Sequence, residues 1–370
     1  MHRDIPFSQF FFPKSFKKRL EEAQRDRFEG IVEKLEKKFC EKFSHEYALS
    51  TCSSTAALHL SMCALDLKRG DKVICSVNAF VDIPEVVRHF DAEPIFVDCD
   101  RRSYNIDPDM LEAALAKHKA KKLRAVIVNH MAGLPVDMER VVELAKKYNI
   151  AVIEDCTDSP YREMTTKADK SEMKIYSFGS KTDNRYDGGM LVSSRKELHE
   201  RAALLRNHAK FDIAGELNYL YDVVDIGCQY RMSEYGAVYA LAELDGESED
   251  IRRRKEIADI YFDELRGLKH ISLPIESKSH SYKFFIVEVD KNRDAFSRAL
   301  KKQGIETSLH YIPIHSLKYY KEKYSLKIFD YPNAMSAYQS VMTLPNTPNL
   351  SDEDVVRICR SIRQIDKTHI

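Results

Sequence analysis

The 370-residue chain contains no tryptophan and only 12 glycines and 12 prolines. No apolar run approaches the ~18 residues that a membrane-spanning helix needs. Lysine and arginine together number 58, as do aspartate and glutamate, so the formal net charge is zero. Because no long basic block occurs, nothing indicates binding to nucleic acid or to a membrane surface. Phe10 to Phe12 are too few for a signal-peptide core, and the positive charge follows them instead of preceding them.

Several common motifs are also missing. The eight cysteines include no C-x-x-C pair, and several lie in apolar segments, which predicts reduced core residues of a cytoplasmic protein. The 13 histidines show no H-E-x-x-H spacing, so we do not expect a metal site. No G-x-G-x-x-G follows a predicted strand, which argues against a dinucleotide enzyme. The length suits one large domain and a smaller one.

Residues 151–194 contain three short apolar segments, each next to residues that can take part in chemistry. The first ends in Asp155, the second leads to Ser177, Ser180 and Lys181, and the third begins at Gly188. Apolar runs this short, bounded by polar and glycine residues, are typical of buried strands. In open α/β sheets, ligands bind at the carboxyl ends of the strands. We therefore expect Asp155 and Lys181 to lie where one cofactor could contact both.

Strands and helices alternate before this region. The pattern predicts strands at residues 72–77, 94–99 and 125–130 and helices at residues 82–90, 108–118 and 137–148. Such alternation is typical of βαβ units, so we expect a mostly parallel sheet with helices on both faces. Near the N-terminus, apolar residues recur at spacings of three and four, which predicts one amphipathic helix carrying Phe28, Ile31, Leu35, Phe39 and Phe43.

The C-terminal part follows a different pattern. A long helix is predicted over residues 233–268 with an interruption near Gly246, where we place the boundary between a large domain, 1–245, and a small α+β domain, 246–370. The other elements predicted after Gly189 are helices at 195–207, 293–302, 335–340 and 352–362 and strands at 283–289 and 307–310. Ser351 is a plausible N-cap for the last helix.

Two further features lie at the same predicted sheet edge. Ser53, Ser54 and Thr55 stand between a short strand and an apolar helix. A helix N-terminus offers free N–H groups and the positive end of the dipole, so it can bind a phosphate; a plain serine N-cap is the other interpretation. Phe80 follows the strand at 72–77, where its ring could stack on a ligand or pack in the core.

Lys181 and Asp155 together indicate pyridoxal phosphate (PLP) chemistry. A lysine that forms a Schiff base and a carboxylate that keeps the pyridine nitrogen protonated are the minimum protein contribution to PLP catalysis. The lysine must be partly desolvated so that its neutral amine can act as a nucleophile. At about 4 Å and an effective dielectric of about 20, the ion pair at the ring nitrogen amounts to roughly 4 kcal/mol before desolvation. Either residue alone would more simply be an ordinary strand-end aspartate or a solvated loop lysine.

From about residue 5 to residue 362, the ordered motifs resemble those of the DegT/StrS family of PLP-dependent nucleotide-sugar aminotransferases. The matching segments are Ser53–Leu58 (the phosphate turn S-G-T-A-A-L), Phe80, Glu154–Asp155, Ser177–Phe178 with Lys181, Gly188–Met190, and residues 205–208, 227–232, 309–311 and 344–353. The resemblance implies PLP-transferase fold type I, with a large α/β domain around a mostly parallel sheet and a small α+β domain. It also implies a homodimer in which residues 227–232 reach into the partner's active site.

The resemblance further implies a reaction and residue roles. An amino group would pass from an amino acid, usually L-glutamate, to a keto group of a nucleotide-linked sugar, for surface glycan or amino-sugar biosynthesis. Lys181 would bind the cofactor and then move the proton. The other implied contacts are Asp155 with the ring nitrogen, Ser54, Thr55 and Ser177 with the phosphate, Phe80 with the ring face, Asp158 beside the phenolic oxygen, Gln229 from the partner-reaching segment, and Arg185, Tyr186, His310 and Tyr311 with the substrate.

The chain departs from the family pattern at five places. Ser54 replaces a glycine of the phosphate turn, which restricts the backbone there. Asp158 replaces a glutamine, and a second carboxylate disfavours the cofactor phenolate. Ser177 lies one residue closer to Lys181 than usual, so Ser180 could take over its phosphate contact. Gln229 replaces an asparagine with the same amide chemistry. Arg185 begins a triplet that replaces T-G-E and could bind a carboxylate or diphosphate, or be solvated.

Three alternatives remain open at this point. The family's dehydratase branch carries histidine in place of the lysine, whereas this chain keeps Lys181. An aminotransferase with an acceptor other than a nucleotide sugar would fit the changes at Ser54, Asp158 and Arg185. A PLP-fold protein without turnover, acting as a binding or regulatory partner, would fit the shortened spacing between Ser177 and Lys181.

Overall fold

The computed structural model describes residues 3–8, 12–118, 122–159, 171–179, 187–213 and 219–368. Ser180, Lys181, Arg185 and Tyr186 lie outside this range. The helices are α1 (Phe16–Arg25), α2 (Ile31–Phe43), α3 (Ser54–Ala64), α4 (Asp82–Arg88), α5 (Pro108–His118), α6 (Met138–Tyr148), α7 (Lys196–Leu205), α8 (Glu234–Leu265), α9 (Arg293–Lys302), α10 (Lys318–Tyr324), α11 (Pro332–Ser340) and α12 (Asp352–Thr368), with short 3₁₀ turns η1 (Met131–Gly133), η2 (Ile314–Ser316) and η3 (Ile328–Asp330). The strands are β1 (Tyr47–Thr51), β2 (Lys72–Ser76), β3 (Glu93–Val97), β4 (Leu123–Asn129), β5 (Ala151–Asp155), β6 (Met173–Gly179), β7 (Asp187–Ser193), β8 (Lys210–Asp212), β9 (Tyr221–Val223), β10 (Ile271–Ser272), β11 (Phe285–Val289) and β12 (Val341–Leu344).

The central sheet has seven strands in the order β1-β7-β6-β5-β4-β2-β3. The neighbours from β6 to β3 pair in parallel, whereas β7 runs antiparallel to both β1 and β6. The predicted mixed α/β fold with a mostly parallel sheet is therefore confirmed. Because β2, β4, β5 and β6 run in one direction, their carboxyl ends meet at one edge of the sheet, where ligands bind in such folds.

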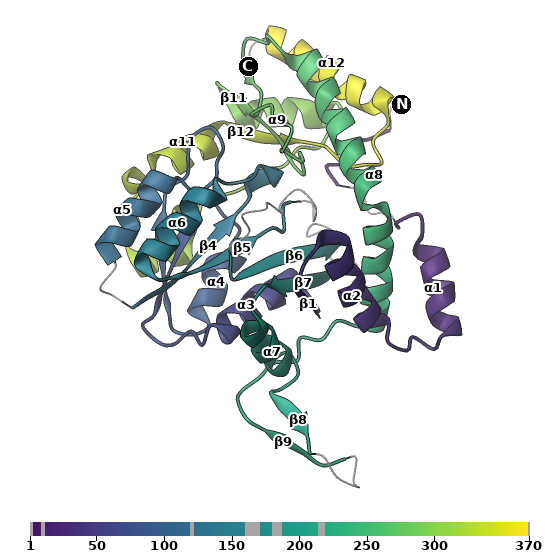
Figure 1. The fold of residues 1–370 in the computed structure, drawn as a ribbon. Coiled ribbons are helices and arrows are strands. Elements are labelled where there is room, and N and C mark those ends of the chain that lie inside the picture. The colour runs from purple at the N-terminus through teal and green to yellow at the C-terminus, as the bar shows by residue number, and fades with distance from the viewer. Residues whose placement is uncertain are drawn as a thin grey trace.

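Helices cover both faces of this sheet (Figure 1). On one face, α3, α4 and α7 pack over a core that includes Leu58, Ile153 and Leu191. On the other face, α5 and α6 cover one half around Val126 and Val152, and α2 and α8 cover the other half. Parallel strands that are buried on both faces need nearly continuous apolar runs, which is what the sequence displays.

A second core lies beyond the C-terminal half of α8. The helix packs there against α12 and shares this core with β11, β12 and α9, and both chain ends lie on this side of the molecule (Figure 1). The three-stranded sheet β10-β11-β12 forms one side of this second core. The predicted interruption near Gly246 is wrong, because α8 is continuous from Glu234 to Leu265. A glycine inside a helix lowers its stability but does not end it when both halves pack against cores.

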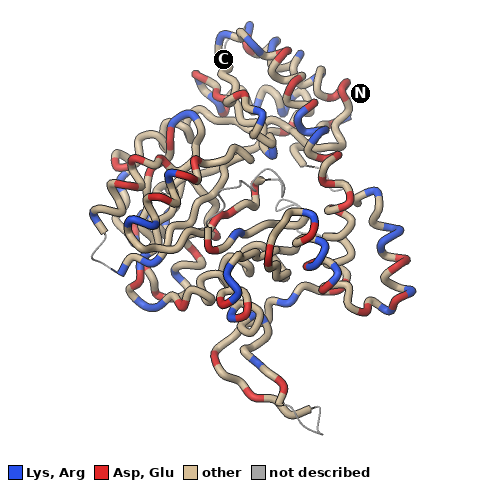
Figure 2. Tube along the Cα trace, viewed as in Figure 1, with Lys and Arg blue, Asp and Glu red and all other residues tan. Residues whose placement is uncertain are grey.

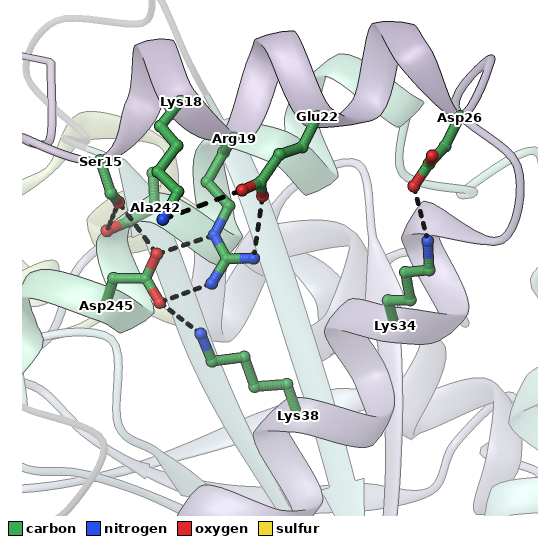
Figure 3. A network of polar contacts seen from close by, with 9 residues as sticks. All are labelled: Ser15, Lys18, Arg19, Glu22, Asp26, Lys34, Lys38, Ala242 and Asp245. Carbon is green, nitrogen blue, oxygen red and sulfur yellow. Dashed lines mark hydrogen bonds and ion pairs between the residues drawn. The ribbon is translucent and has the colours of Figure 1, made fainter.

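The N-terminal prediction of a single helix is also wrong. Phe28 and Gly30 have φ angles of 60° and 62°, so the chain turns there and α2 begins only at Ile31. Polar contacts hold α1 and α2 against α8 (Figure 3). The Asp245 carboxylate accepts hydrogen bonds from Arg19 Nε at 2.8 Å and Ser15 Oγ at 2.9 Å, and it also pairs with Lys38 of α2. One carboxylate thus joins three helices.

Two other elements differ from the prediction. Residues 307–310 form only an isolated bridge, between Ser308 and Thr343, instead of the predicted strand. The residues after α7 contain the hairpin β8–β9, which was not predicted and which projects from the body of the molecule (Figure 1). Lys and Arg alternate with Asp and Glu along the outer helices (Figure 2), in keeping with the balanced charge. Among the described residues, none of the helices has the length and apolar character to cross a bilayer.

Candidate active site

Asp155 is the last residue of β5 and is 4% exposed. Its Oδ1 accepts a hydrogen bond from Thr157 N–H at 3.0 Å, which fixes the carboxylate at the sheet edge. Since neighbouring residues of a strand face opposite sides, Asp155 shares the α3 face with Ile153, and Glu154 points the other way. The placement at the carboxyl edge matches the one expected from sequence.

The start of α3 lies beside two neighbouring strands. Ser53 is its N-cap, with Oγ accepting from Ala56 N–H at 3.0 Å, and Ser54 and Thr55 form the first turn, whose amides have no partner inside the helix. Gly189 pairs with Thr51 on one side and with Ser177 on the other. A Cβ at Gly189 would lie 2.4 Å from Ser53 O, so only glycine permits this approach. The arrangement brings the first turn of α3 and Ser177 close together on either side of Gly189.

Phe80, Asp158 and Tyr311 form a second group, which borders the site on the side of β2 and η2. Phe80 is 42% exposed, so it is not a core residue, and its ring centroid lies 5.7 Å from that of Tyr311. Tyr311 donates a hydrogen bond from Oη to Asp158 Oδ2 at 2.9 Å. Burial, followed by the Asp158 charge, holds the pKa of Tyr311 well above its ordinary value, so the phenol stays protonated and donates. The structure therefore brings Phe80, Asp158 and Tyr311 together.

Two other predicted site residues, His310 and Gln229, make different contacts from those of Phe80, Asp158 and Tyr311. His310 is buried, stacks on Phe284 with ring centroids 3.7 Å apart, and bonds through Nδ1 to Thr343 Oγ1 at 2.9 Å. These contacts hold the His310 ring between Phe284 and Thr343 of β12. Gln229 is exposed on a segment that passes the start of α3, where Cys52 N–H donates to Tyr230 O at 2.9 Å.

Behind Asp155 lies a buried charge cluster that no local sequence pattern predicts. Glu154 Oε2 lies 3.1 Å from His130 Nε2, and Oε1 lies 3.2 Å from Lys174 Nζ. Val136 N–H donates to His130 Nδ1, so the ring proton is on Nε2 and points to Glu154. Burial alone would raise the pKa of Glu154, but the bond from His130 and the Lys174 charge lower it to about 2. This cluster holds the end of β5 in place.

Sequence reasoning also missed two polar residues at the site. Asn129 ends β4 and pairs with Asp155 across the sheet; it is 5% exposed, and its Oδ1 has no hydrogen-bond partner within the described part of the chain. Its position at the end of an apolar run, like that of Asp155, was the available signal. Glu243 accepts a bond from Gly179 N–H at 2.7 Å, and burial raises its pKa to about 7. No local pattern marks it, because α8 brings it to the end of β6.

Comparison with known proteins gives a consistent result. Residues 15–363 match the DegT/DnrJ/EryC1/StrS aminotransferase family. The chain is 32% identical to GDP-perosamine synthase of Escherichia coli, with 90% of each chain covered, and 29% identical to the spore coat polysaccharide biosynthesis protein SpsC of Bacillus subtilis, with 91% and 90% covered. A DegT DnrJ EryC1 StrS aminotransferase from Brucella abortus has a similar structure, with a TM-score of 0.83, 26% identity and 94% of each chain covered.

The chain belongs to the DegT/DnrJ/EryC1/StrS aminotransferase family. It is a PLP-dependent enzyme of this family. The described residues fit the cofactor: a buried carboxylate ends β5, a helix N-terminus suited to a phosphate lies beside Gly189, and Asn129 has an unpartnered buried oxygen at the same edge. A carboxylate for the ring nitrogen and free amides for the phosphate are the groups that PLP requires.

Proposed function

We propose that this aminotransferase moves an amino group from L-glutamate to a keto group of a nucleotide-linked sugar, for surface glycan or amino-sugar biosynthesis. The observation that carries the proposal is the joint position of Asp155 and the α3 turn around Gly189, together with the family membership. The names of two relatives, a GDP-perosamine synthase and a spore coat polysaccharide biosynthesis protein, support an activated sugar as the acceptor.

Bound PLP supplies an electron sink for the reacting amine. In the proposal, Lys181 binds the cofactor and then carries the proton between the substrate carbon and the cofactor. Asp155 keeps the ring nitrogen protonated, and the amides of Ser54 and Thr55 hold the phosphate with Ser177. Phe80 would contact one face of the ring, and Asp158 would lie beside the phenolic oxygen. Tyr311 donates a hydrogen bond to Asp158, and this bond stabilises the carboxylate charge and so lessens its repulsion of a phenolate.

Arg185 and Tyr186 complete the proposed substrate site. His310 contributes to it indirectly, because its ring packs against that of Tyr311.

We also propose that the chain has two domains, divided near residue 246 within α8. We further propose that the protein is a homodimer in which the partner contributes Gln229. Exposed apolar side chains on and beside β8–β9 support the homodimer: Phe211, Tyr219, Tyr221, Val223, Val224 and Ile226 are 43–92% exposed. A patch of this kind marks an interaction surface. A cytoplasmic location is part of the proposal and rests on the cysteine pattern of the sequence.

The test is the visible absorbance of the purified protein with PLP, before and after L-glutamate. Wild type is expected to show the band of lysine-bound cofactor, and glutamate is expected to bleach it. Lys181→Ala should lack the band, while a matched surface variant, Lys146→Ala on α6, should keep it. A band that glutamate leaves unchanged would remove the proposed donor. A protein that shows no band would contradict the enzymatic proposal as a whole.

The acceptor is tested separately, by offering nucleotide-linked keto sugars to the glutamate-treated enzyme. Return of the lysine-bound band with formation of an amino sugar is the expected result. One observation favours a second candidate, a keto acceptor that is not nucleotide-linked: Asp158, three residues after Asp155, adds a carboxylate that accepts a hydrogen bond from Tyr311. If only keto acids without a nucleotide restore the band, this second candidate is correct.

A further inference from the structure

A cluster of soft metal-binding donors lies away from the proposed active site. His59 and Cys63 stand one turn apart on α3, so both side chains project from the same face of the helix. Cys228 approaches them from the segment that precedes α8. One ring nitrogen of His59 and the two sulfur atoms all lie within 4.8 Å of one another. All three residues are half-buried.

The distance between His59 and Cys63 fits an edge of a tetrahedral site, and Cys228 lies within 4.8 Å of both. With zinc–sulfur bonds of about 2.3 Å and zinc–nitrogen bonds of about 2.0–2.1 Å, the sulfur–nitrogen edge of a tetrahedron is about 3.5 Å. The Cys63 Sγ to His59 Nδ1 distance is 3.6 Å. Tyr230 Oη lies 3.3 Å from the same nitrogen, which is about the edge expected for an oxygen donor or a water at the fourth position.

The backbone holds the third donor in position. Cys228 N–H donates to Leu205 O at 2.8 Å, and Cys228 O accepts from His208 N–H at 3.0 Å. The His59 ring is fixed as well, because it stacks on Phe90 with centroids 4.9 Å apart. A site whose donors are held before the metal arrives loses little conformational entropy on binding.

A second group of three candidate donors, His130, Glu154 and Cys156, shows what excludes a metal. Its donor atoms are equally close, but Lys174 Nζ lies 3.2 Å from Glu154 and the His130 ring proton points to the same carboxylate. A lysine ammonium therefore already pairs with the carboxylate that a metal would need as a ligand. Within the described parts of the chain, no lysine or arginine is hydrogen-bonded to the donor atoms of the cluster at His59, since Arg201 donates to the backbone oxygen of Cys63.

We propose that His59, Cys63 and Cys228 form a binding site for a zinc-class divalent cation that joins α3 to the segment carrying Gln229. Two thiolates and a neutral imidazole balance the charge of Zn²⁺ and match its preference for sulfur and nitrogen. Burial and the neighbouring Cys228 raise the pKa of Cys63 to about 12, so binding must release the thiol proton. The metal would be structural, linking the helix that starts at the phosphate turn to the partner-reaching segment.

The test uses tag-free holoenzyme that has been reduced, treated with chelator and dialysed. Titration with Co²⁺ is expected to give one equivalent per chain, with the long-wavelength bands of tetrahedral cobalt and a sulfur-to-cobalt charge-transfer band. Zn²⁺ should displace the cobalt and raise the melting temperature. Cys63→Ser and Cys228→Ser should each weaken binding at least tenfold, while Cys52→Ser, an exposed cysteine beside Tyr230, should bind as wild type does.

Circular dichroism and the PLP band establish that each variant is folded, and His59→Gln provides a second variant with both thiols intact. Binding that is equal in wild type and in the triad variants would overturn the proposal. So would a Cys63–Cys228 disulfide that persists under reducing purification and leaves cobalt unbound. Because the readout is the metal and not transamination, failure of the metal site leaves the proposed function untouched.

Discussion

The buried cluster of Glu154, His130 and Lys174 allows one prediction to be worked out in detail. Glu154→Gln keeps the shape of the side chain but removes its charge, so Lys174, which is 4% exposed, loses the carboxylate that lies 3.2 Å from its Nζ, and His130 loses its charged acceptor. Removing one charge from a buried ion pair costs about 3–5 kcal/mol, because the buried group that remains was paired with it. The prediction is a loss of this size in the free energy of unfolding at pH 7.

The pKa of Glu154 gives an independent estimate of the same quantity. The carboxyl is lowered from its ordinary pKa of 4.5 to about 2 in the folded protein. At about 1.4 kcal/mol for each tenfold change in the equilibrium, this corresponds to about 3 kcal/mol. A lowered folded-state pKa contributes stability that is complete above pH ~4.5 and is lost as the pH falls towards ~2. The difference between wild type and Glu154→Gln should therefore shrink in acid.

The assay is urea unfolding followed by far-ultraviolet circular dichroism, since the chain has no tryptophan. Protein concentration is kept constant, because association would shift the apparent stability. The control is Glu143→Gln, an exposed residue of α6, which should stay within about 0.5 kcal/mol of wild type. The double variant Glu154→Gln/Lys174→Met removes both charges and should recover part of the loss. A Glu154→Gln variant within about 1 kcal/mol of wild type at pH 7 would refute the reasoning.

Two further predictions concern the cofactor and the helix contacts. Asp155→Asn can still accept the Thr157 N–H bond and should fold, but the ring nitrogen loses an ion pair of roughly 4 kcal/mol before desolvation. We expect the bleaching by L-glutamate to slow roughly 10²–10³-fold in stopped-flow measurements, and an unchanged rate would contradict the role of Asp155. Asp245→Asn should cost about 1–2 kcal/mol in urea unfolding, because its charged hydrogen bonds are partly exposed. Burial opposes this, but bonds from Arg19, Lys38 and Ser15 lower the pKa of Asp245. The loss should therefore begin to shrink as the pH falls below ~4 and should disappear only as the pH falls through the lowered pKa of the folded state; a loss that stays constant as the pH falls from ~5 to ~2 would exclude the carboxylate as its cause.

The sequence by itself determined the main sheet and which side chains stand at the carboxyl edge of its strands. Strands such as β5 and β6 are short apolar runs with polar ends, and hydrophobic burial dictates them without reference to distant residues. The start of α3 could also be predicted from local sequence, because the N-cap Ser53 bonds to the helix only three residues away. Asp155 and Phe80 were therefore found correctly at the carboxyl edge.

Local patterns failed where the backbone conformation or long-range packing decides. The left-handed turn at Phe28 splits the N-terminal helix, whereas packing at both ends carries α8 through Gly246. Lys181, Arg185 and Tyr186 remain predictions, because they lie outside the described residues.

Only the tertiary structure brought together groups that are distant in the chain. Tyr311 is hydrogen-bonded to Asp158, Glu243 is hydrogen-bonded to Gly179, and Cys228 lies beside His59 and Cys63. In each case more than fifty residues of sequence separate the partners. Hydrophobic periodicity reports which face of an element is buried, and it does so from neighbours within a turn or two. Periodicity carries no information on which two buried faces pack against each other. That packing decides which partners surround polar groups such as Glu154 and Glu243, and the partners in turn set their pKa values.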